Sequence, residues 1–256
     1  FQNEKLCEVS NFIRISIPKD LDKLEDLIKK KRPSIIINTI GYSNVDFCEE
    51  NQKESKILNV DFVQNIFNIC NKEKIKIIHF STDYVFDGLK NRYDELDYKN
   101  PLNYYGMTKN ISEEIILKNS NNCVIRTSFV YGISSNMRFF NYVLNKLKQG
   151  EKIHVYSNSK FTPTLIDDLI NGVIIIIEKN LKGLYHITGP NCINKIDFIR
   201  LIAQELKINK NLIQIIYDKE KQNIAKRPDS SCLNNNKIIK EGLILSTLID
   251  GIKKCV

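Results

Sequence analysis

Three short runs of apolar residues constrain the fold of this chain more than any other feature. They lie at residues 34–38, 75–80 and 123–127. A short unbroken apolar run is typical of a strand that is buried on both faces of a parallel sheet. Between the runs, apolar residues recur every three or four positions, which indicates helices with one buried face. These helical stretches cover residues 21–31, about 52–71, and the segment from just after Pro101 to about residue 118.

Strands and helices that alternate at this spacing indicate βαβ units. We therefore expect an α/β fold with a Rossmann-like, doubly wound parallel sheet and right-handed crossovers. A further strand is predicted at residues 12–17, where apolar and polar residues alternate. After Gly132 the alternation loosens. The patterns there predict helices at 137–147, 165–178 and 194–206, strands at 152–156, 183–187 and 213–217, and partial helical periodicity at 238–255.

Composition excludes several classes of function. Hydrophobic residues make up 42% and charged residues 27% of the 256 residues, as in ordinary soluble globular proteins. The net charge of +8 comes from lysines spread along the chain, so we expect a solvated surface and no nucleic-acid interface. A mild positive field also attracts small molecules that carry phosphate. No apolar run reaches the roughly 18 residues of a membrane span, so no membrane partner is expected.

The seven cysteines indicate neither a metal site nor a redox motif. No two of them form a C-x-x-C pair, and no histidine stands at a spacing that suggests zinc. Several lie in apolar surroundings, where cysteine acts as a small hydrophobe. The chain also shows no secretory leader. We therefore expect a cytoplasmic protein whose cysteines are reduced.

A tyrosine and a lysine four residues apart are the first sign of catalysis. The spacing itself is weak, because it occurs at Tyr105/Lys109, Tyr142/Lys146, Tyr156/Lys160 and Tyr217/Lys221. Only the first pair follows a buried strand that ends in Ser81-Thr82, and only it begins a helix just after a proline. We therefore take Tyr105 and Lys109 as the catalytic pair.

This pair suits the protonation of a carbonyl oxygen during hydride transfer. Residues four apart lie on one face of a helix. A phenol has a pKa of about 10, and a neighbouring ammonium lowers it by stabilising the phenolate. We expect Lys109 to have this effect on Tyr105. Thr82 or Ser81 would donate a second hydrogen bond to the substrate oxygen as negative charge develops on it.

Longer motifs around these residues resemble the dTDP-4-dehydrorhamnose reductase family, extended short-chain dehydrogenases that act on sugar nucleotides. Three segments carry most of the resemblance: 81–88 (STDYVFDG), 101–109 (PLNYYGMTK) and 126–132 (RTSFVYG). Similar segments follow the family's order along nearly the whole chain. They are 38–49 (NTIGYSNVDFCE), Leu58-Asn59-Val60, Thr162-Pro163-Thr164, 183–186 (GLYH) and Arg227-Pro228.

The resemblance assigns roles to three catalytic residues. Tyr105 corresponds to the family's proton donor, and Lys109 to its partner, which also holds the nicotinamide ribose. Thr82 corresponds to the hydroxyl that polarises the 4-keto oxygen. The implied reaction is NADPH- or NADH-dependent reduction of a nucleotide-linked 4-keto-6-deoxy sugar, in the biosynthesis of deoxysugars for surface polysaccharide.

The resemblance also implies the binding residues. The turn Thr39-Ile40-Gly41 matches the turn that contacts the cofactor, together with Tyr105 and Lys109. Asp83 and Tyr84 match positions that line the sugar pocket, and Phe129 stands where reductases often carry a tryptophan against the substrate. Dehydratases of this kind typically carry glutamate at the position of Tyr84, so the tyrosine favours reduction over dehydration.

Two other functions stay open. Regulatory subunits of methionine adenosyltransferase share this fold and these motifs, so the chain could be a non-catalytic binding subunit. An epimerase or a dehydratase on the same scaffold is the other alternative. The expected partner is a nucleotide-sugar molecule, and a homodimer is possible.

The chain departs from the family at two places. Residues 158–164 (NSKFTPT) lack the family's Gln and Gly and gain Phe161. The chain also has no glycine before Gly41, whereas the family opens with a strand and a Gly-rich turn that holds the cofactor pyrophosphate. We expect that strand and turn to be missing, which would leave an open position or an exposed apolar groove in the sheet.

The resemblance predicts two parts that share an interface. Residues 1–133, with about 165–188, would form an N-terminally incomplete dinucleotide-binding domain. Residues 134–164 and 189–256 would form a smaller substrate-binding α/β part.

Overall fold

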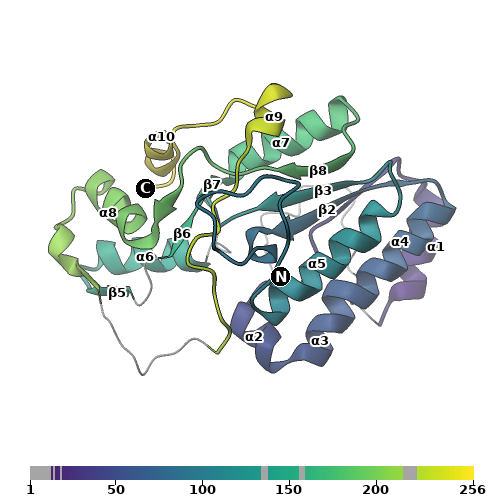
Figure 1. The fold of residues 1–256 in the computed structure, drawn as a ribbon, viewed down its shortest axis with the longest axis horizontal. Helices are drawn as coiled ribbons and strands as arrows, with labels where there is room; N and C mark the ends of the chain where they lie inside the picture. The colour runs from purple at the N-terminus through teal and green to yellow at the C-terminus, as the bar shows by residue number, and fades with distance from the viewer. Residues whose placement is uncertain (1–12, 14, 18, 134–137, 156–158, 216–223) are drawn as a thin grey trace.

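A computed structural model of the chain describes residues 13, 15–17, 19–133, 138–155, 159–215 and 224–256. Its centre is a four-stranded parallel sheet in the order β1-β2-β3-β8 (Figure 1). The three apolar runs and the strand predicted at 183–187 form these four strands, so the predicted fold class is confirmed. The strands are β1 (Ile35–Asn38), β2 (Lys76–Thr82), β3 (Cys123–Thr127) and β8 (Gly183–His186).

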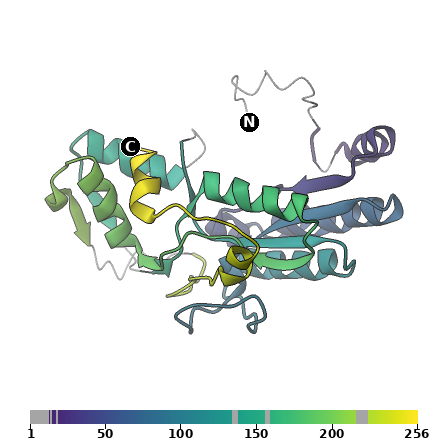
Figure 2. The same cartoon turned by 90° about the horizontal axis from the view of Figure 1, so that it is seen from above.

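Helices cover both faces of this sheet (Figure 2). One face packs against α1 (Leu21–Lys31), α4 (Phe62–Lys72) and α5 (Tyr104–Leu117). The other face packs against α7 (Ile166–Glu178) and α9 (Asn236–Lys240). Neighbouring residues of β2 point to opposite faces, so Ile77 belongs to the first core and Ile78 to the second. This two-sided burial explains why the strands read as unbroken apolar runs.

The helix predicted at about 52–71 is interrupted. It consists of α3 (Gln52–Lys56), a π-helical turn (Ile57–Asp61) and α4. Asn59 lies in the π-helical turn, where its side chain accepts a hydrogen bond from the Tyr42 N–H (2.8 Å) and donates one to the Thr108 hydroxyl (3.1 Å). A short helix that the sequence did not predict, α2 (Val45–Glu50), precedes α3.

The C-terminal part packs around a core of its own. Its helices are α6 (Arg138–Lys148), α8 (Lys195–Glu205) and α10 (Leu248–Lys253). Strands β5 (Ile153–Val155) and β10 (Ile213–Ile215) pair in parallel. Four two-residue strands were not predicted, because two residues are too few to show a periodicity. They are β4 (Val130–Tyr131), paired with β7 (Thr164–Leu165), and β6 (Lys160–Phe161), paired with β9 (Ile193–Asn194).

The strand predicted at residues 12–17 is wrong for the described residues of that stretch, because 13 and 15–17 are not in a strand. Residues 12 and 14, and the ends of three other predicted elements (137, 156, 216 and 217), lie outside the described residues. Strand β1 lies at the edge of the sheet, and the Ile37 and Ile40 side chains beside this edge are 45% and 41% exposed. None of the described helices is long and apolar enough to cross a membrane.

Candidate active site

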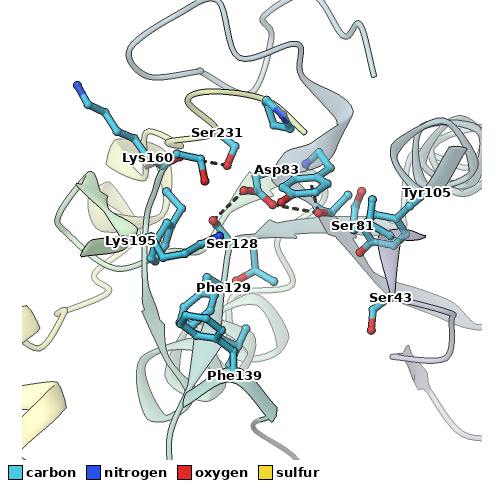
Figure 3. Close-up of a pocket in the computed structure, with 18 residues that line it drawn as sticks. Ser43, Ser81, Asp83, Tyr105, Ser128, Phe129, Phe139, Lys160, Lys195 and Ser231 are labelled. Carbon is cyan, nitrogen blue, oxygen red and sulfur yellow. Dashed lines mark hydrogen bonds between the residues drawn. The ribbon is translucent and has the colours of Figure 1, made fainter. Parts of the chain in front are cut away.

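A cavity of about 530 Å³ lies where the carboxyl end of the sheet meets the C-terminal part (Figure 3). Ser81, Asp83 and Tyr105 line one side of it, and Phe129, Phe139 and Lys195 line the other. Thr82 and Tyr84 also line the cavity. The structure therefore brings together five of the residues predicted for the site: Thr82, Asp83, Tyr84, Tyr105 and Phe129.

The first turn of α5 places Tyr105 against the end of β2. Asn103 caps this helix: its Oδ1 accepts from the Gly106 N–H (2.9 Å), and its Nδ2 donates to the Lys226 carbonyl (2.8 Å). Gly106 permits a very close approach, since a Cβ there would stand 2.1 Å from the Tyr84 carbonyl oxygen. The Tyr105 and Tyr84 rings consequently meet edge to face, with centroids 6.2 Å apart.

The phenol of Tyr105 is held in its protonated form. Burial raises its pKa above the usual value, and the negative charge of Asp83 adds to the rise, while a hydrogen bond with Thr82 opposes it. The prediction that Lys109 lowers this pKa is wrong for this structure. The shift comes from burial and from Asp83, and Lys109 Nζ lies 3.2 Å from His79 Nε2.

Lys109 is buried on α5, one turn after Tyr105. Burial lowers the pKa of Lys109 to about 8, and the negative charge of Glu113 partly opposes this shift. The group is therefore mostly charged at pH 7 and half-protonated near pH 8, which suits a residue that takes up and releases protons.

The two hydroxyls at the end of β2 differ in their partners. Thr82 Oγ1 accepts from the Tyr84 N–H (3.2 Å) and donates to Asp83 Oδ1 (3.0 Å), so it stays at the cavity. Ser81 Oγ donates to Glu113 Oε1 at 2.5 Å. That carboxylate is fully buried in a two-pronged ion pair with Arg126. Ser81 is consequently committed to a structural network, which leaves Thr82 as the hydroxyl for the substrate.

Asp83 ties two walls of the cavity together. Its two carboxylate oxygens accept from Thr82 Oγ1 and from Ser128 Oγ (2.8 Å). Burial raises the pKa of Asp83, while hydrogen bonds from Ser231, Ser128 and Thr82 lower it. Three of its acceptor positions are thus taken by protein hydroxyls, and the residue acts on the cavity chiefly by orienting Thr82.

The facing wall is aromatic. The Phe129 ring lies 5.3 Å from Phe139, 4.8 Å from Phe161 and 5.4 Å from Phe198, measured between centroids. Phe161, which the sequence marked as a departure from the family, fills the space beneath Phe129. Two lysines, Lys160 and Lys195, also line the cavity, and the Lys160 side chain extends away from the rings (Figure 3). Burial lowers the pKa of Lys195, and the positive charge of Arg227 lowers it further.

We compared the chain with known protein families, and one family matches it. Residues 15–256 match the family described as the RmlD substrate binding domain. This chain belongs to that family. The resemblance read from its motifs is therefore confirmed.

Relatives of this RmlD-family chain are reductases. The dTDP-4-dehydrorhamnose reductase of Aggregatibacter actinomycetemcomitans is 32% identical over 230 residues, which cover 85% of this chain and 78% of that protein. The Bacillus anthracis dTDP-4-dehydrorhamnose reductase, solved in complex with NADP, matches with a TM-score of 0.85 at 25% identity, covering 91% of this chain and 84% of that one. A Streptomyces venezuelae dTDP-glucose 4,6-dehydratase matches with a TM-score of 0.83 at 17% identity, over 98% and 81% of the two chains, so only the fold is shared.

The turn Thr39-Ile40-Gly41 follows the carboxyl end of β1. The Ile40 N–H donates to Asn38 Oδ1 (3.1 Å), and a Cβ at Gly41 would stand 2.9 Å from Asn59 Oδ1. Across the sheet, Thr127 Oγ1 lines the cavity and is buried without a hydrogen-bond partner in the described part of the chain. The unsatisfied buried hydroxyl of Thr127 is a donor that suits a dinucleotide.

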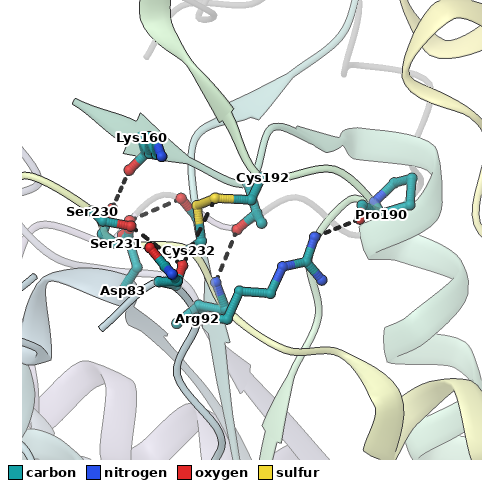
Figure 4. The surroundings of a disulfide bond; sticks show 12 residues. Asp83, Arg92, Lys160, Pro190, Cys192, Ser230, Ser231 and Cys232 are labelled. Carbon is teal, nitrogen blue, oxygen red and sulfur yellow. Dashed lines mark hydrogen bonds between the residues drawn. A yellow bond between two sulfur atoms is a disulfide. The ribbon is translucent and has the colours of Figure 1, made fainter. Parts of the chain in front are cut away.

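A segment near the C-terminus contributes Pro228 and Ser231 to the lining of the RmlD-family cavity, and Figure 4 shows part of this segment around Ser231 and Cys232. Ser231 lines the cavity, and its N–H donates to the Lys160 carbonyl (2.9 Å). The next residue, Cys232, forms a disulfide with Cys192. The prediction that all seven cysteines are reduced is therefore wrong for this pair, which sequence spacing could not reveal. Arg227 anchors the start of the segment through a two-pronged ion pair with Asp46 of α2.

Sequence reasoning missed several residues that support the site. They are Asn38, His79, Glu113, Arg126 and Lys195. For Glu113 a signal was present, because it lies four positions after Lys109 on the same helix face. For His79 the signal was a lone titratable residue inside an apolar strand, three positions before Thr82.

Proposed function

We propose that this chain is an NADPH- or NADH-dependent reductase of a nucleotide-linked 4-keto-6-deoxy sugar, acting in deoxysugar and surface-polysaccharide biosynthesis. One observation carries the proposal. A protonated phenol, Tyr105, lies beside the Thr82 hydroxyl at the wall of a cavity large enough for a sugar. Membership of a family whose relatives are reductases supports the same reaction.

The catalytic roles fall to three residues. The bound dinucleotide supplies the hydride to the keto carbon. Tyr105 donates its phenolic proton to the carbonyl oxygen, and its raised pKa keeps that proton in place until it is needed. Rotation of the Thr82 hydroxyl away from Asp83 aims a second donor at the same oxygen. Lys109, one turn later on α5, then supplies the proton that restores the phenol.

The cofactor would be held by the turn Thr39-Ile40-Gly41 together with Tyr105 and Lys109. The Thr127 hydroxyl offers a further donor at the cavity. The complex of the Bacillus anthracis reductase with NADP supports NADPH as the hydride source. Asp83, Tyr84 and Phe129 would contact or shape the sugar site.

The charged part of a sugar nucleotide matches the cations of the facing wall. Lys160 and Lys195 line the cavity, and Arg227 is close enough to Lys195 to lower its pKa. Such a group of positive charges stabilises a diphosphate. We assign this side to the diphosphate and the aromatic side to the sugar.

Tyr84 favours reduction over elimination of water. Burial raises the pKa of Tyr84 to about 12, so it stays neutral and cannot replace the glutamate base of a dehydratase. A dehydratase needs an additional acid and base at this position.

The test is an assay of nicotinamide oxidation with the full-length protein. A panel of dTDP- and UDP-linked 4-keto-6-deoxy sugars is supplied with NADPH and, in parallel, with NADH. We expect turnover with at least one 4-keto sugar and a preference for NADPH. A well-folded protein that binds NADPH but reduces none of the panel contradicts the proposal and favours a binding subunit.

Two further assignments follow from this reaction. Nucleotide sugars and NADPH are intracellular metabolites, so we place the protein in the cytoplasm. A homodimer is the oligomer that we propose, and light scattering on the full-length protein measures it.

A further inference from the structure

His79 occupies an unusual position for an ionisable residue. It lies on β2, its ring is fully buried, and both ring nitrogens have partners. On one side, Nε2 lies 3.2 Å from Lys109 Nζ and 3.2 Å from Ser112 Oγ. On the other side, Nδ1 lies 3.1 Å from Asn38 Nδ2, across the β1–β2 register. The ring therefore connects the lysine to the last residue of β1.

The Asn38 amide fixes which ring nitrogen carries the proton. Its Oδ1 accepts from the Ile40 N–H, and only the oxygen of an amide can accept. Its Nδ2 therefore faces His79 and donates to Nδ1. Burial and the charge of Lys109 both lower the pKa of His79 well below its usual range, so the ring is neutral. A neutral ring that accepts at Nδ1 carries its proton on Nε2.

This tautomer bears directly on Lys109. An Nε2–H group donates to a neutral amine, but it opposes an ammonium, because two donors then face each other. A charged Lys109 needs Nε2 as an acceptor, which moves the ring proton to Nδ1. The Asn38 amide must then flip so that its oxygen accepts from the Nδ1–H group, and its hydrogen bond with the Ile40 N–H is lost. The charge of the lysine and the hydrogen bond of the turn therefore compete with each other.

We propose that Asn38 and His79 are positioning residues that couple the charge of Lys109 to the Ile40 N–H of the turn after β1, through the tautomer of the His79 ring. The proposal rests on the function proposed above, in which Lys109 supplies a proton to Tyr105 and the turn contacts the cofactor. Release of the Ile40 N–H when Lys109 is charged makes that amide available to a phosphate or hydroxyl oxygen. The arrangement links cofactor contact to a lysine that is ready to donate.

Few other charges reach Lys109. Glu113, on the same helix, is the carboxylate that favours the ammonium. It is itself neutralised by Arg126 of β3 (2.7 Å), and Lys99 lies 3.6 Å from it. Burial raises the pKa of Tyr105 on α5 and of Cys48 on α2, so both are neutral. The His79 ring is therefore the partner whose change of state Lys109 senses most directly.

The first test is a pH titration of the full-length protein without substrate, followed by nitrogen-15 NMR of labelled histidine. The chain has three histidines, and the His79→Gln variant identifies the signal. We expect His79 to stay neutral at pH 6 and to change from the Nδ1–H to the Nε2–H tautomer with a midpoint near 8, where Lys109 loses its charge. A single tautomer throughout, or an imidazolium that forms near pH 6.5, overturns the proposal.

The second test uses Asn38→Asp. A carboxylate accepts from both the Ile40 N–H and a His79 Nδ1–H, so it holds the tautomer that favours a charged Lys109. We expect the Nδ1–H form at every pH, and an alkaline limb of kcat/KM shifted upward by about one pH unit. If the pH dependence of the His79 tautomer and the alkaline limb of kcat/KM are the same in Asn38→Asp as in the wild type, the coupling is contradicted.

Asn122→Asp is the matched control. Asn122 is equally buried, its Oδ1 accepts from the Ile77 N–H (2.9 Å), and its Nδ2 donates to the Ile116 carbonyl (2.9 Å). This variant carries the same chemical change away from Lys109, so it should lose stability without moving the tautomer or the alkaline limb. The two proposals fail separately. A wild-type protein that reduces no 4-keto sugar defeats the function, whereas a wild-type His79 that never changes tautomer defeats the coupling alone.

Discussion

The two walls of the cavity are built by different forces. On the wall formed by β2 and α5, the polar side chains are held by hydrogen bonds of 2.5–3.2 Å. These are the hydrogen bonds that Ser81, Thr82 and Lys109 each make with a neighbouring side chain. On the facing wall, four phenylalanine rings pack with centroids 4.8–5.8 Å apart. Hydrogen bonds are directional and fix individual atoms, whereas ring packing adapts to changes of shape. The first wall is therefore suited to chemistry and the second to selecting a ligand.

Removal of the Tyr105 hydroxyl should show most clearly that the two walls have different roles. We expect Tyr105→Phe to lower kcat by about 10²–10⁴-fold, because the proton donor is lost, while binding of NADPH stays within a few-fold. Stopped assays of sugar reduction and NADPH titration by fluorescence measure the two effects. Tyr104→Phe changes the neighbouring ring and should retain activity. Retained turnover in Tyr105→Phe would remove Tyr105 from the mechanism.

Loss of the buried ion pair should weaken the polar wall as a whole. Arg126→Met leaves the Glu113 carboxylate buried without its cation. We expect the free energy of unfolding to fall by about 3–5 kcal/mol, as measured by urea denaturation. The exposed pair Arg200–Asp197 (3.1 Å) supplies the control. Arg200→Met should change stability by less than about 1 kcal/mol, and equal losses would deny the importance of burial.

Mild acid should lower the stability of the sheet that carries the polar wall, because two of its histidines are buried. Burial lowers the pKa of His186 to about 3, and that of His79 well below its usual range. Below pH 6.5 the unfolded chain binds protons that the folded chain does not, so stability falls as the pH falls from about 6.5. The slope is about 1.4 kcal/mol per pH unit for each histidine. His186→Gln should remove one such contribution, and urea denaturation at a series of pH values measures the change in slope.

The smallest effect is expected from the aromatic wall. Phe129→Ala removes ring contacts worth about 0.5–1.5 kcal/mol each. We expect KM for the sugar nucleotide to rise by about ten-fold, with kcat within about three-fold of the wild type. Steady-state kinetics measure both. A fall in kcat as large as that of Tyr105→Phe would show that this wall also takes part in the chemistry.

The sequence predicted the sheet well because burial on both faces leaves an unbroken apolar run, as at Ile77 and Ile78. It also predicted the residues that line the polar wall, because motif and helix spacing place Thr82 and Tyr105 together. It could not predict that Lys109 faces His79, since that contact joins a strand to a helix through side-chain orientation. The disulfide between Cys192 and Cys232 was missed for a similar reason. Their proximity depends on β9 and on a C-terminal segment without periodicity.

The segment that runs from Arg227 to Cys232 has a consequence for synthesis of the protein. It is anchored to α2 at Asp46 and to Tyr93, whose N–H donates to the Cys232 carbonyl (2.9 Å). Both anchors emerge from the ribosome long before the segment does. The nascent chain can thus form its sheet before this segment emerges, and the binding site is completed later. A chain stopped before residue 227 would lack this side of the active site, and it would also lack α9 and α10, which pack into the two neighbouring cores.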